Sequence, residues 1–462
     1  MKSYLDLIDQ TFYFPTAEFR IESNSLFFND IPLEEIIRKY GTPLKISYLP
    51  KISYQIQQSK IAFQEAFKKL GYSGKYIYCY CTKSSHFKFI LNEVLKNDCY
   101  LETSSTYDID ILWKLYHDGR IHKDFLVVCN GFKKEAYVRS ISDMINQGFQ
   151  KVTPILDNLE EVDYYINHIP GEFQVGIRVA ADEEPNFDFY TSRLGIRYGD
   201  VINFYQQKLQ QHKRIKLKIL HFFINSGIRD TQYYWTELSK FIYKYCELHK
   251  VCPDLDTIDI GGGFPIKTSL AYNYDRIFMT EQIIETIKQI CDQNQVPYPN
   301  IITEFGNYTV GESGAMIYKV IGQKLQNDKE LWYMVDGSFI THIPDSWAKN
   351  QKFILLAINN WHKNYRKVHL GGITCDSDDY YNSEEHSGDV YLPAVEKGEP
   401  QYIGFFHTGA YQENLSGYGG LQHCLIPATK HIIIDKDENG NFSYELFRDE
   451  QKSDEMLRLL GY

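Results

Sequence analysis

The sequence lacks the features that mark membrane proteins, secreted proteins and nucleic-acid-binding proteins. No stretch approaches the roughly eighteen consecutive apolar residues that a membrane span requires. The opening segment MKSYLDLIDQTFYFP is interrupted by acidic residues, so we expect no signal peptide. The formal net charge of -11 argues against a nucleic-acid partner, because phosphates attract basic surfaces. We therefore expect neither a membrane nor a nucleic acid as a partner.

Cysteine occurs without the spacing of a metal site. The nine cysteines are scattered from Cys79 to Cys424, and none forms a C-x-x-C pair. Cys79 and Cys81 lie two apart in a predicted strand, so they point the same way and need further ligands to complete a tetrahedral site. The odd number and the scatter favour a reduced, cytoplasmic protein, and we predict no metal.

The length and composition are those of a globular protein with two domains. The chain has 462 residues, which is more than one hydrophobic core usually supports. Hydrophobic residues make up 43% and charged residues 24%, as in ordinary globular proteins. No sequence repeat or low-complexity tract is present.

Short apolar runs alternate with helical segments up to about residue 304. Between two such runs, Phe87, Ile90, Leu91 and Val94 have helical spacing. Alternating strands and helices predict parallel pairing through right-handed crossovers. Eight such units match the number and span of a (β/α)8 barrel; a doubly wound open sheet is the alternative. The eight apolar runs are 76–81, 99–102, 124–129, 152–156, 173–179, 216–222, 255–260 and 300–304.

The pattern changes after residue 310 to short β-rich segments separated by turn residues. These segments predict an antiparallel β domain, as a sandwich or barrel-like sheet. The segments SLFFND and PLKISYL near the N-terminus also have strand composition, and we expect them to join that domain. The predicted organisation is an N-terminal segment over 1–48, a barrel over 49–308 and a C-terminal β domain over 309–462.

Lys83 follows directly after the first predicted barrel strand. Barrel enzymes carry their catalytic residues at the C-terminal ends of the strands, so this lysine would point into the site. Burial there would lower the pKa of the amine, which favours bond formation with a carbonyl group. A solvated lysine at a strand end is the alternative.

Later strand ends carry glycine turns and an acid. Gly261, Gly262 and Gly263 follow the seventh strand and expose backbone N–H groups that suit a phosphate, although a tight turn is the alternative. Glu304 ends the eighth strand, and we expect it at the barrel mouth opposite Lys83. The alternative for Glu304 is an ion pair with Arg178.

Two further candidates lie in the predicted β domain. Cys375 stands beside Asp376 and Asp379, and nearby acids would raise the pKa of the thiol, which suits a proton donor. An acidic surface turn is the alternative; the ligand set is too small for a calcium loop. Tyr411 offers a phenol to a phosphate, or is a buried structural tyrosine.

In this order, these motifs resemble the fold-type III pyridoxal-phosphate decarboxylases, which include ornithine, diaminopimelate and arginine decarboxylases, with alanine racemase more distant. The CDSDD form and the segment YGTPL at 40–44 are most similar to arginine decarboxylases. The motifs that carry the resemblance are CTKSS at 81–85, LETSSTYD at 101–108, GIRVA at 176–180, NSG at 225–227, GGGFP at 261–265, EFGN at 304–307, CDSDD at 375–379 and GAY at 409–411.

The resemblance implies a set of roles for these residues. Lys83 would hold pyridoxal phosphate as a Schiff base, Glu304 would meet the pyridine nitrogen, and Glu102 would take the acidic position of the second strand. Cys375 would return a proton to Cα. The remaining expected roles are cofactor binding by Arg178, Phe223, Ser226, Gly227, Gly261, Gly262, Gly263, Asn307 and Tyr411, and binding of a small basic amino-acid substrate by Asp376 and Asp379.

The resemblance also implies an assembly and a reaction. In the family the Cys-Asp segment comes from the partner subunit, so a homodimer with shared active sites is expected. The expected reaction is decarboxylation of arginine to agmatine in polyamine biosynthesis. Alternatives are an ornithine, lysine or diaminopimelate decarboxylase, an amino-acid racemase, or a non-catalytic regulatory homologue that binds the cofactor.

Two positions depart from the family pattern. Phe223 stands where the family usually has a histidine that stacks on the cofactor; a phenyl ring can stack but cannot donate a proton. Asn307 stands where the family usually has an arginine, so a positive charge is lost from the phosphate site.

Overall fold

The computed structural model describes residues 16–181, 193–381, 390–396 and 398–462, and the chain divides into two compact units. The barrel unit contains residues 53–265 and 274–309. The β unit contains the residues up to 52, the short segment 266–273 and residues 310–462. The chain thus passes through the β unit at both ends and once in between.

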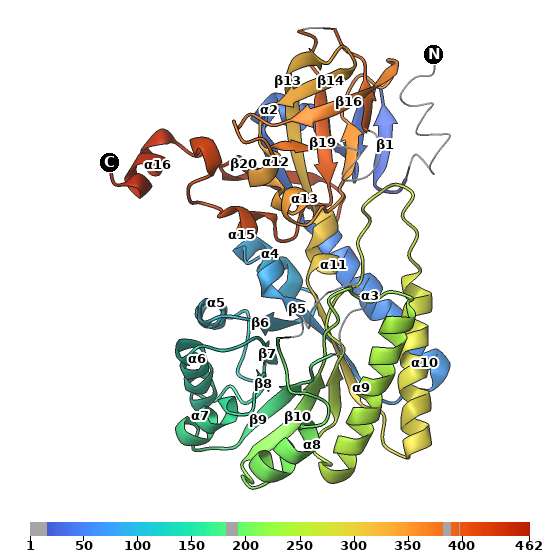
Figure 1. The fold of residues 1–462 in the computed structure, drawn as a ribbon, viewed down its shortest axis with the longest axis vertical. Helices are drawn as coiled ribbons and strands as arrows, with labels where there is room; N and C mark the ends of the chain where they lie inside the picture. Colours follow the sequence, from blue (N-terminus) through green and yellow to red (C-terminus); the bar gives the residue numbers. More distant parts are fainter. Residues whose placement is uncertain (1–15, 182–192, 382–389, 397) are drawn as a thin grey trace. The chain divides into compact units, whose positions relative to one another are not determined.

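The barrel unit is built on eight parallel strands that close into a ring (Figure 1). The order is β10-β11-β12-β5-β6-β7-β8-β9, and the pairing of β12 with β5 closes the barrel. The closed ring confirms the predicted barrel and excludes the open sheet. The strands are β5 (Tyr76–Cys81), β6 (Tyr100–Thr103), β7 (Val127–Cys129), β8 (Val152–Leu156), β9 (Phe173–Arg178), β10 (Ile215–His221), β11 (Thr257–Asp259) and β12 (Asn300–Phe305).

Apolar side chains fill the inside of the barrel. Cys79, Val128, Ile155, Ile219 and Ile302 come from five different strands and form one buried cluster. Side chains alternate along a strand, so each strand places such residues inside and others against the surrounding helices. Polar residues are therefore tolerated mainly at the strand ends.

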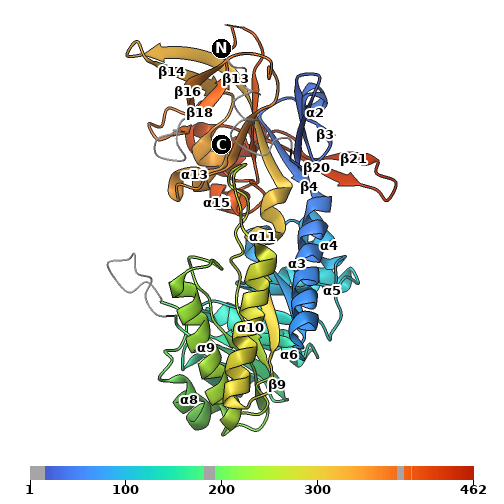
Figure 2. The same ribbon diagram turned by 90° about the vertical axis from the view of Figure 1, so that its right-hand side faces the viewer.

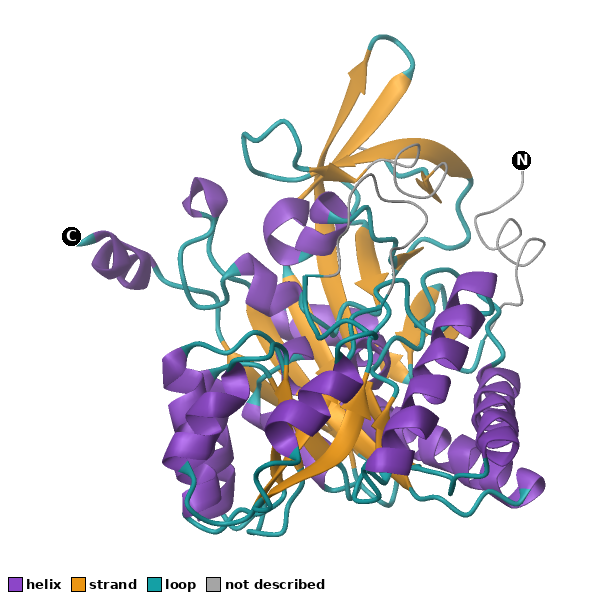
Figure 3. Cartoon of the chain, turned by 60° about the horizontal axis from the view of Figure 1, so that its bottom comes forward, coloured by secondary structure: helices purple, strands orange, loops and turns teal. Residues whose placement is uncertain are grey.

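Helices surround the barrel strands (Figure 3). Helices α9 and α10 run side by side on its outside (Figures 1 and 2). Several begin at a residue whose side chain accepts a hydrogen bond from a backbone N–H of the first turn, as Ser105 does for α5 and Thr231 for α9. The helices are α3 (Leu49–Leu70), α4 (Lys88–Leu95), α5 (Thr106–His117), α6 (Glu135–Asn146), α7 (Glu161–His168), α8 (Val201–Phe204), α9 (Gln232–Val251), α10 (Arg276–Asn294) and α11 (Asn307–Val310).

The β unit contains a ten-stranded sheet and a separate three-stranded sheet. Most pairs of the large sheet are antiparallel, whereas β4 with β20 and β14 with β16 are parallel. The strands are β1 (Phe19–Glu22), β2 (Ser25–Phe28), β3 (Ile31–Pro32), β4 (Leu44–Tyr48), β13 (Gly314–Gln326), β14 (Glu330–Val335), β15 (Ile354–Ala357), β16 (Tyr365–Gly371), β17 (Tyr380–Tyr381), β18 (Val390–Pro393), β19 (Tyr402–Phe406), β20 (Lys430–Lys436) and β21 (Phe442–Arg448).

The N-terminal strands belong to two different sheets of this unit. Strand β4 pairs with β13 and β20 inside the large sheet, whereas β1, β2 and β3 form the small sheet by themselves. Both sheets contribute to one apolar core that includes Phe28, Ile46 and Phe405. The remaining helices are α2 (Leu33–Tyr40), α12 (Phe339–His342), α13 (Pro344–Ala348), α15 (Gln412–Ser416) and α16 (Ser453–Leu460). Over the described ranges, every helix is too short or too polar to cross a bilayer.

Candidate active site at the mouth of the barrel

Lys83 lies in the one-turn helix that follows β5, and it forms an ion pair at the barrel mouth. Its Nζ is 2.8 Å from Oε2 of Glu102, the penultimate residue of β6. The Lys83 side chain is 45% exposed, whereas the Glu102 side chain is fully buried. An accessible amine is thus held in place by a buried carboxylate.

The charge state of Lys83 differs from the expectation. Burial acts to lower the pKa of the amine, but the Cys81 thiol and the neighbouring carboxylates outweigh burial and raise that pKa well above its usual value. The predicted lowering is therefore wrong, because two acids of neighbouring strands stabilise the ammonium form.

Glu304 is the penultimate residue of β12 and carries an ionised carboxylate. Its Oε1 accepts a hydrogen bond of 2.7 Å from Nδ2 of Asn130, and its Oε2 is 3.4 Å from Nε2 of His221. Burial acts to raise the pKa of Glu304, but His221 and Lys83 lower it to about 2. Because β12 pairs directly with β5, Glu304 lies on the strand next to the one that Lys83 follows.

Asp259 and His221 complete a compact cluster with Glu304. One ligand atom from each of the three lies within 4.8 Å of the others. Burial and the charge of Glu304 raise the pKa of Asp259 well above its usual value, which favours the protonated form of Asp259. Burial lowers the pKa of His221, although Glu304 opposes the shift. We call His221, Asp259 and Glu304 the barrel-mouth cluster.

Several buried polar atoms around this cluster lack a hydrogen-bond partner among the described residues. They include Oε1 of Glu102, Oδ1 of Asn130, Oδ2 of Asp259 and both ring nitrogens of His221. Buried polar groups in folded proteins are nearly always hydrogen-bonded, and exceptions mark missing ions, waters or ligands. These atoms leave the barrel mouth with hydrogen-bonding capacity for a polar molecule.

The two predicted glycine turns lie against each other beyond β10 and β11. Gly227, Gly261 and Gly263 have φ angles of 79°, 67° and 116°, which residues other than glycine rarely adopt. The N–H of Ile228 donates to the carbonyl of Gly263 over 3.0 Å. A Cβ on Gly262 would stand 2.2 Å from the carbonyl oxygen of Glu304. Glycine is thus required for the backbone to line this edge of the barrel.

The remaining predicted barrel residues lie at neighbouring strand ends. Arg178 ends β9 beside His221, and its guanidinium carbon is 5.8 Å from the centroid of the Phe223 ring. Phe223 is 37% exposed, so its ring is available to a ligand. Ser226 is exposed in the first glycine turn, and Asn307 is partly buried at the start of α11.

The predicted residues of the β unit form a second group. Sγ of Cys375 is 3.4 Å from Sγ of Cys424, and Oδ2 of Asp376 is 3.3 Å from Nε2 of His423. The hydrogen bond with Cys424 is the main reason that the pKa of Cys375 is raised, and Asp376 contributes less than the acid-rich sequence suggested. Tyr411 is partly buried, with Nζ of Lys349 5.6 Å from its ring centroid.

Asp379 has a structural role, and the expectation that it binds substrate is corrected. Its side chain is buried and accepts hydrogen bonds from the backbone N–H of Phe339 at 2.7 Å and from Oγ1 of Thr374 at 2.6 Å. Ser338 Oγ also donates to it, at 3.1 Å. The carboxylate thus holds the start of α12 against its own loop and offers nothing to a ligand.

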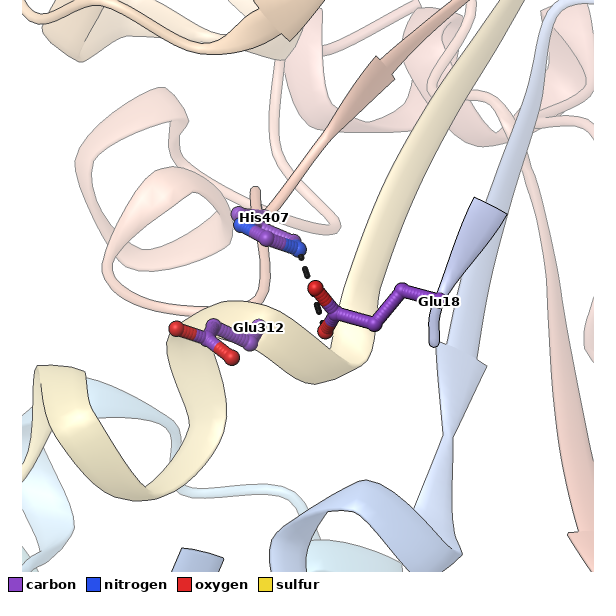
Figure 4. Close-up of side chains that lie close together, drawn as sticks. All are labelled: Glu18, Glu312 and His407. Carbon is purple, nitrogen blue, oxygen red and sulfur yellow. Dashed lines mark ion pairs between the residues drawn. The ribbon is translucent and has the colours of Figure 1, made fainter. Parts of the chain in front are cut away.

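A second cluster of acids and histidine lies in the β unit (Figure 4). We call Glu18, Glu312 and His407 the Glu18 cluster. Lys51 forms ion pairs with both carboxylates, and Lys267 pairs with Glu18 at 2.8 Å. Burial opposes the effect, but His407 and the two lysines hold the pKa of Glu18 well below its usual value. A cation would have to displace these ammonium groups, so the cluster is a closed charge network and a poor metal site.

The family model described as the pyridoxal-binding domain of pyridoxal-dependent decarboxylases matches residues 54–311, more than half of the chain.

The chain belongs to the pyridoxal-dependent decarboxylases. It is an amino-acid decarboxylase of that family, and its cofactor is pyridoxal phosphate. The closed barrel with a separate, mostly antiparallel β unit is the fold of its solved neighbours.

Two relatives and two solved structures illustrate the similarity. The biosynthetic arginine decarboxylase of Prochlorococcus marinus (strain MIT 9215) is 23% identical over 92% of this chain and 83% of its own length. That of Vibrio vulnificus (strain YJ016) is 21% identical over 92% and 84%. The biosynthetic arginine decarboxylase of Campylobacter jejuni superposes with a TM-score of 0.83 at 20% identity, covering 100% and 91% of the two chains. A diaminopimelate decarboxylase from M. jannaschii gives 0.78 at 18%, covering 96% and 97%.

The barrel mouth of this decarboxylase fits the cofactor of the family. Pyridoxal phosphate needs an amine, a carboxylate that stays ionised and a backbone surface for its phosphate. Lys83, Glu304 and the paired glycine turns supply these, and the unsatisfied atoms of Asn130 and His221 offer polar contacts.

Sequence reasoning missed three residues of this site. Asn130 follows the end of β7, and His221 and Asp259 are the last residues of β10 and β11. Their positions in the sequence could have identified them, because a polar residue at the C-terminal end of a barrel strand lies at the face where barrel enzymes have their active sites. His221 and Asp259 were visible in the strand-end motifs, but only the glycine turns after them received a role.

Proposed function

We propose that this decarboxylase converts arginine to agmatine, as a step of polyamine biosynthesis. The main support is the ion pair of Lys83 with Glu102 beside the ionised Glu304. These residues lie in motifs that follow one another in the order found in the family. The support for arginine is that relatives named biosynthetic arginine decarboxylase align with 92% of the chain.

The roles proposed in the barrel follow from charge. Bound pyridoxal phosphate supplies a protonated ring that draws off the electron pair left at Cα when CO₂ departs. Lys83 would hold the cofactor, and its ion pair with Glu102 orients the amine. Glu304 would hold the proton on the pyridine nitrogen, since an ionised acid stabilises the protonated base. Asp259, whose pKa is raised by burial and by Glu304, would fix the orientation of Glu304.

The other barrel residues would hold the phosphate and the ring. The backbone of the turns at Ser226–Gly227 and Gly261–Gly263 would donate N–H groups to the phosphate. Asn307 would add a neutral hydrogen bond. The exposed ring of Phe223, backed by the guanidinium of Arg178, would pack against one face of the cofactor.

We further propose that a second copy of the chain completes the site. Cys375, whose raised pKa keeps its proton at neutral pH, would deliver that proton to Cα. Asp376, with about a third of its side chain exposed, would pair with the distal guanidinium of arginine. A homodimer in which these two residues serve the partner's barrel follows from these roles.

We propose the cytoplasm as the compartment. All nine cysteines are free, and seven of them are buried. Unpaired thiols are typical of reducing compartments.

The test is a panel of L- and D-amino acids with detection of CO₂ and identification of the amine. We expect L-arginine to give agmatine at the highest kcat/KM. A preference for ornithine, lysine or diaminopimelate would move the substrate assignment to the other decarboxylases of this fold. Loss of optical activity without CO₂ would indicate a racemase. If the protein binds the cofactor but yields neither CO₂ nor racemised amino acid, the result would favour a regulatory homologue. Phe223 and Asn307, the two departures from the family pattern, would then be the first residues to examine as causes of the lost activity.

A further inference from the structure

Two loops of the β unit meet through a pair of sulfur atoms. Sγ of Cys375 lies 3.4 Å from Sγ of Cys424, and both residues are exposed. The neighbouring residues, Asp376 and His423, form an ion pair at 3.3 Å. Two successive side chains of one loop thus contact two successive side chains of the other, which keeps the two thiols in register.

The other seven cysteines are all buried. A water-soluble oxidant therefore has access to one pair of thiols, and these two already touch. A disulfide has an S–S length of about 2.05 Å, so the two sulfur atoms need to approach by only about 1.4 Å. Exposed thiols that lie beside a second cysteine have the arrangement of redox-sensing pairs.

We propose that Cys375 and Cys424 form a reversible disulfide when the enzyme meets a peroxide, and that this disulfide switches the enzyme off. The second half of this inference rests on the proposed function, because it takes Cys375 as the proton donor. The first half depends only on the geometry of the two thiols.

The chemistry balances with hydrogen peroxide as the oxidant. Cys424 supplies the thiolate, because the raised pKa of Cys375 keeps that thiol protonated. The thiolate attacks a peroxide oxygen, the O–O bond breaks, and the departing hydroxide takes up the proton that Cys424 released, so that a sulfenic acid and water result. The second thiol then attacks the sulfenic sulfur, the S–O bond breaks, and a second molecule of water leaves. Two thiols are oxidised to one disulfide, and one peroxide is reduced to two waters. A dithiol reverses the reaction by exchange.

A metal site is the competing explanation for two cysteines beside an aspartate and a histidine. A tetrahedral zinc site needs all of its ligand atoms around one point. Within the described part of the chain, the groups of three or more potential ligands gathered in this way are the barrel-mouth cluster and the Glu18 cluster. Cys375, Asp376, His423 and Cys424 meet only as two separate pairs, which favours a disulfide.

The disulfide would block the proposed chemistry in two ways. It removes the S–H proton of Cys375, and it ties the Cys375 loop to the loop of Cys424. Losing a positioned proton donor costs about 10² to 10⁴ in rate, so the oxidised enzyme should turn over at least about a hundredfold more slowly.

The decisive experiment maps the bond without using activity. The purified, cofactor-loaded enzyme is treated with hydrogen peroxide, free thiols are blocked with N-ethylmaleimide in denaturant, and the digest is analysed by mass spectrometry. We expect one peptide pair linked through Cys375 and Cys424, which dithiothreitol separates. The buried Cys246 and Cys291 should carry N-ethylmaleimide and serve as internal controls.

The matched variant is Cys424→Ser, which keeps Cys375 and removes its partner. We expect no linked peptide and a sulfenic acid on Cys375 that dimedone captures. Because an unprotected sulfenic acid is oxidised further and irreversibly, dithiothreitol should restore full turnover to the oxidised wild type but only part of it to this variant.

The possible failures are distinct. Absence of the linked peptide, linkage of other cysteines, or zinc that must be removed before the two thiols react would overturn the disulfide and leave the proposed function untouched. A linked peptide in enzyme that keeps full turnover would leave the disulfide intact and remove Cys375 from the proposed reaction.

Discussion

The barrel-mouth cluster and the Glu18 cluster each contain two acids and one histidine, but the charged groups around them differ. Each buries two acidic side chains beside one histidine, with ligand atoms within 4.8 Å. In the Glu18 cluster the ammonium groups of Lys51 and Lys267 meet the carboxylates directly. At the barrel mouth, the nearby Lys83 pairs with a different acid, Glu102.

The difference extends to the hydrogen bonds. In the Glu18 cluster, Nδ1 of His407 lies 2.8 Å from the carbonyl oxygen of Lys267, and its Nε2 lies 3.6 Å from Glu18. At the barrel mouth, Nδ1 of His221 and Oδ1 of Asn130 have no hydrogen-bond partner among the described residues. A closed network of buried charges maintains a fold, whereas an incomplete one is ready for a ligand. Residue types alone do not separate the two clusters, and Nε2 of His407 also lacks a hydrogen-bond partner among the described residues. The ammonium groups paired with Glu18 and Glu312 are what separate them.

The largest effect is expected at Lys83. Lys83→Ala removes the amine that would hold the cofactor, and we expect turnover to fall by about 10⁴, the upper end for a positioned catalytic group. The absorbance band near the visible edge that lysine-bound pyridoxal phosphate gives should vanish. Lys88, a 70% exposed neighbour, is the control, and Lys88→Ala should change turnover by no more than about twofold. An unchanged band in Lys83→Ala would remove this lysine from the site.

Glu304→Gln tests the ionised member of the barrel-mouth cluster. The amide has the same shape but no charge for a pyridine nitrogen, so we expect turnover to fall by about 10³ with little change in stability. Because the pKa of Glu304 is about 2, this group stays ionised through the working range and contributes no acid limb to the wild-type pH profile. An acid limb near neutral pH that disappears in Glu304→Gln would contradict this.

Glu18→Gln should lower the stability of the fold and leave cofactor binding unchanged, in contrast to Glu304→Gln. It leaves the buried Lys51 and the partly exposed Lys267 beside a neutral amide. Breaking a buried ion pair in this way costs about 3 kcal/mol of unfolding free energy. Cofactor absorbance should be unchanged in the folded variant. Glu22→Gln, in the same hairpin but exposed, should cost no more than about 0.5 kcal/mol. Urea unfolding checks both. Loss of the cofactor from folded Glu18→Gln would break the distinction between the clusters.

The pH dependence of the unfolding free energy also tests the structural role of the ionised Glu18. The pKa of Glu18 is lowered in the folded chain, so its contribution to stability is complete above its usual pKa of 4.5 and is lost as the pH falls toward the folded value. The loss is about 1.4 kcal/mol per pH unit, or about 2 kcal/mol between pH 4.5 and pH 3. The stability gap between wild type and Glu18→Gln should therefore narrow over this range. A gap that widens on acidification would refute the assignment.

The sequence was sufficient for the barrel and for its principal lysine, acid and glycine turns. Strand length and position carried that information, because each strand end of a closed barrel faces the same cavity. The three-stranded sheet of β1, β2 and β3 was not foreseen, since SLFFND looks the same in either sheet. Strand β21 was also missed, because most of its residues are exposed and it has no buried run.

Charge states were the least predictable part of the site. The lowered pKa expected for Lys83 was argued from burial alone, and the reversal depends on the Cys81 thiol and on Glu102 and Glu304 of the two neighbouring strands. Likewise Asp376 and Asp379 look equivalent in CDSDD, yet one is partly exposed and the other is buried within five hydrogen bonds. Spacing gives proximity along the chain, whereas these properties depend on partners distant in sequence.

The smallest expected effect concerns Asn307, where the barrel mouth departs from its family. Asn307→Arg would restore a positive charge at a partly buried position beside the proposed phosphate site. A charge-assisted hydrogen bond contributes about 1.5 kcal/mol, so the Kd of pyridoxal phosphate should fall by about tenfold. Asn307→Asp, of similar size and opposite charge, should raise the Kd instead. Titration of cofactor absorbance measures both, and equal affinities in the two variants would mean that position 307 does not contact the phosphate and that the glycine turns hold it without help from a side chain there.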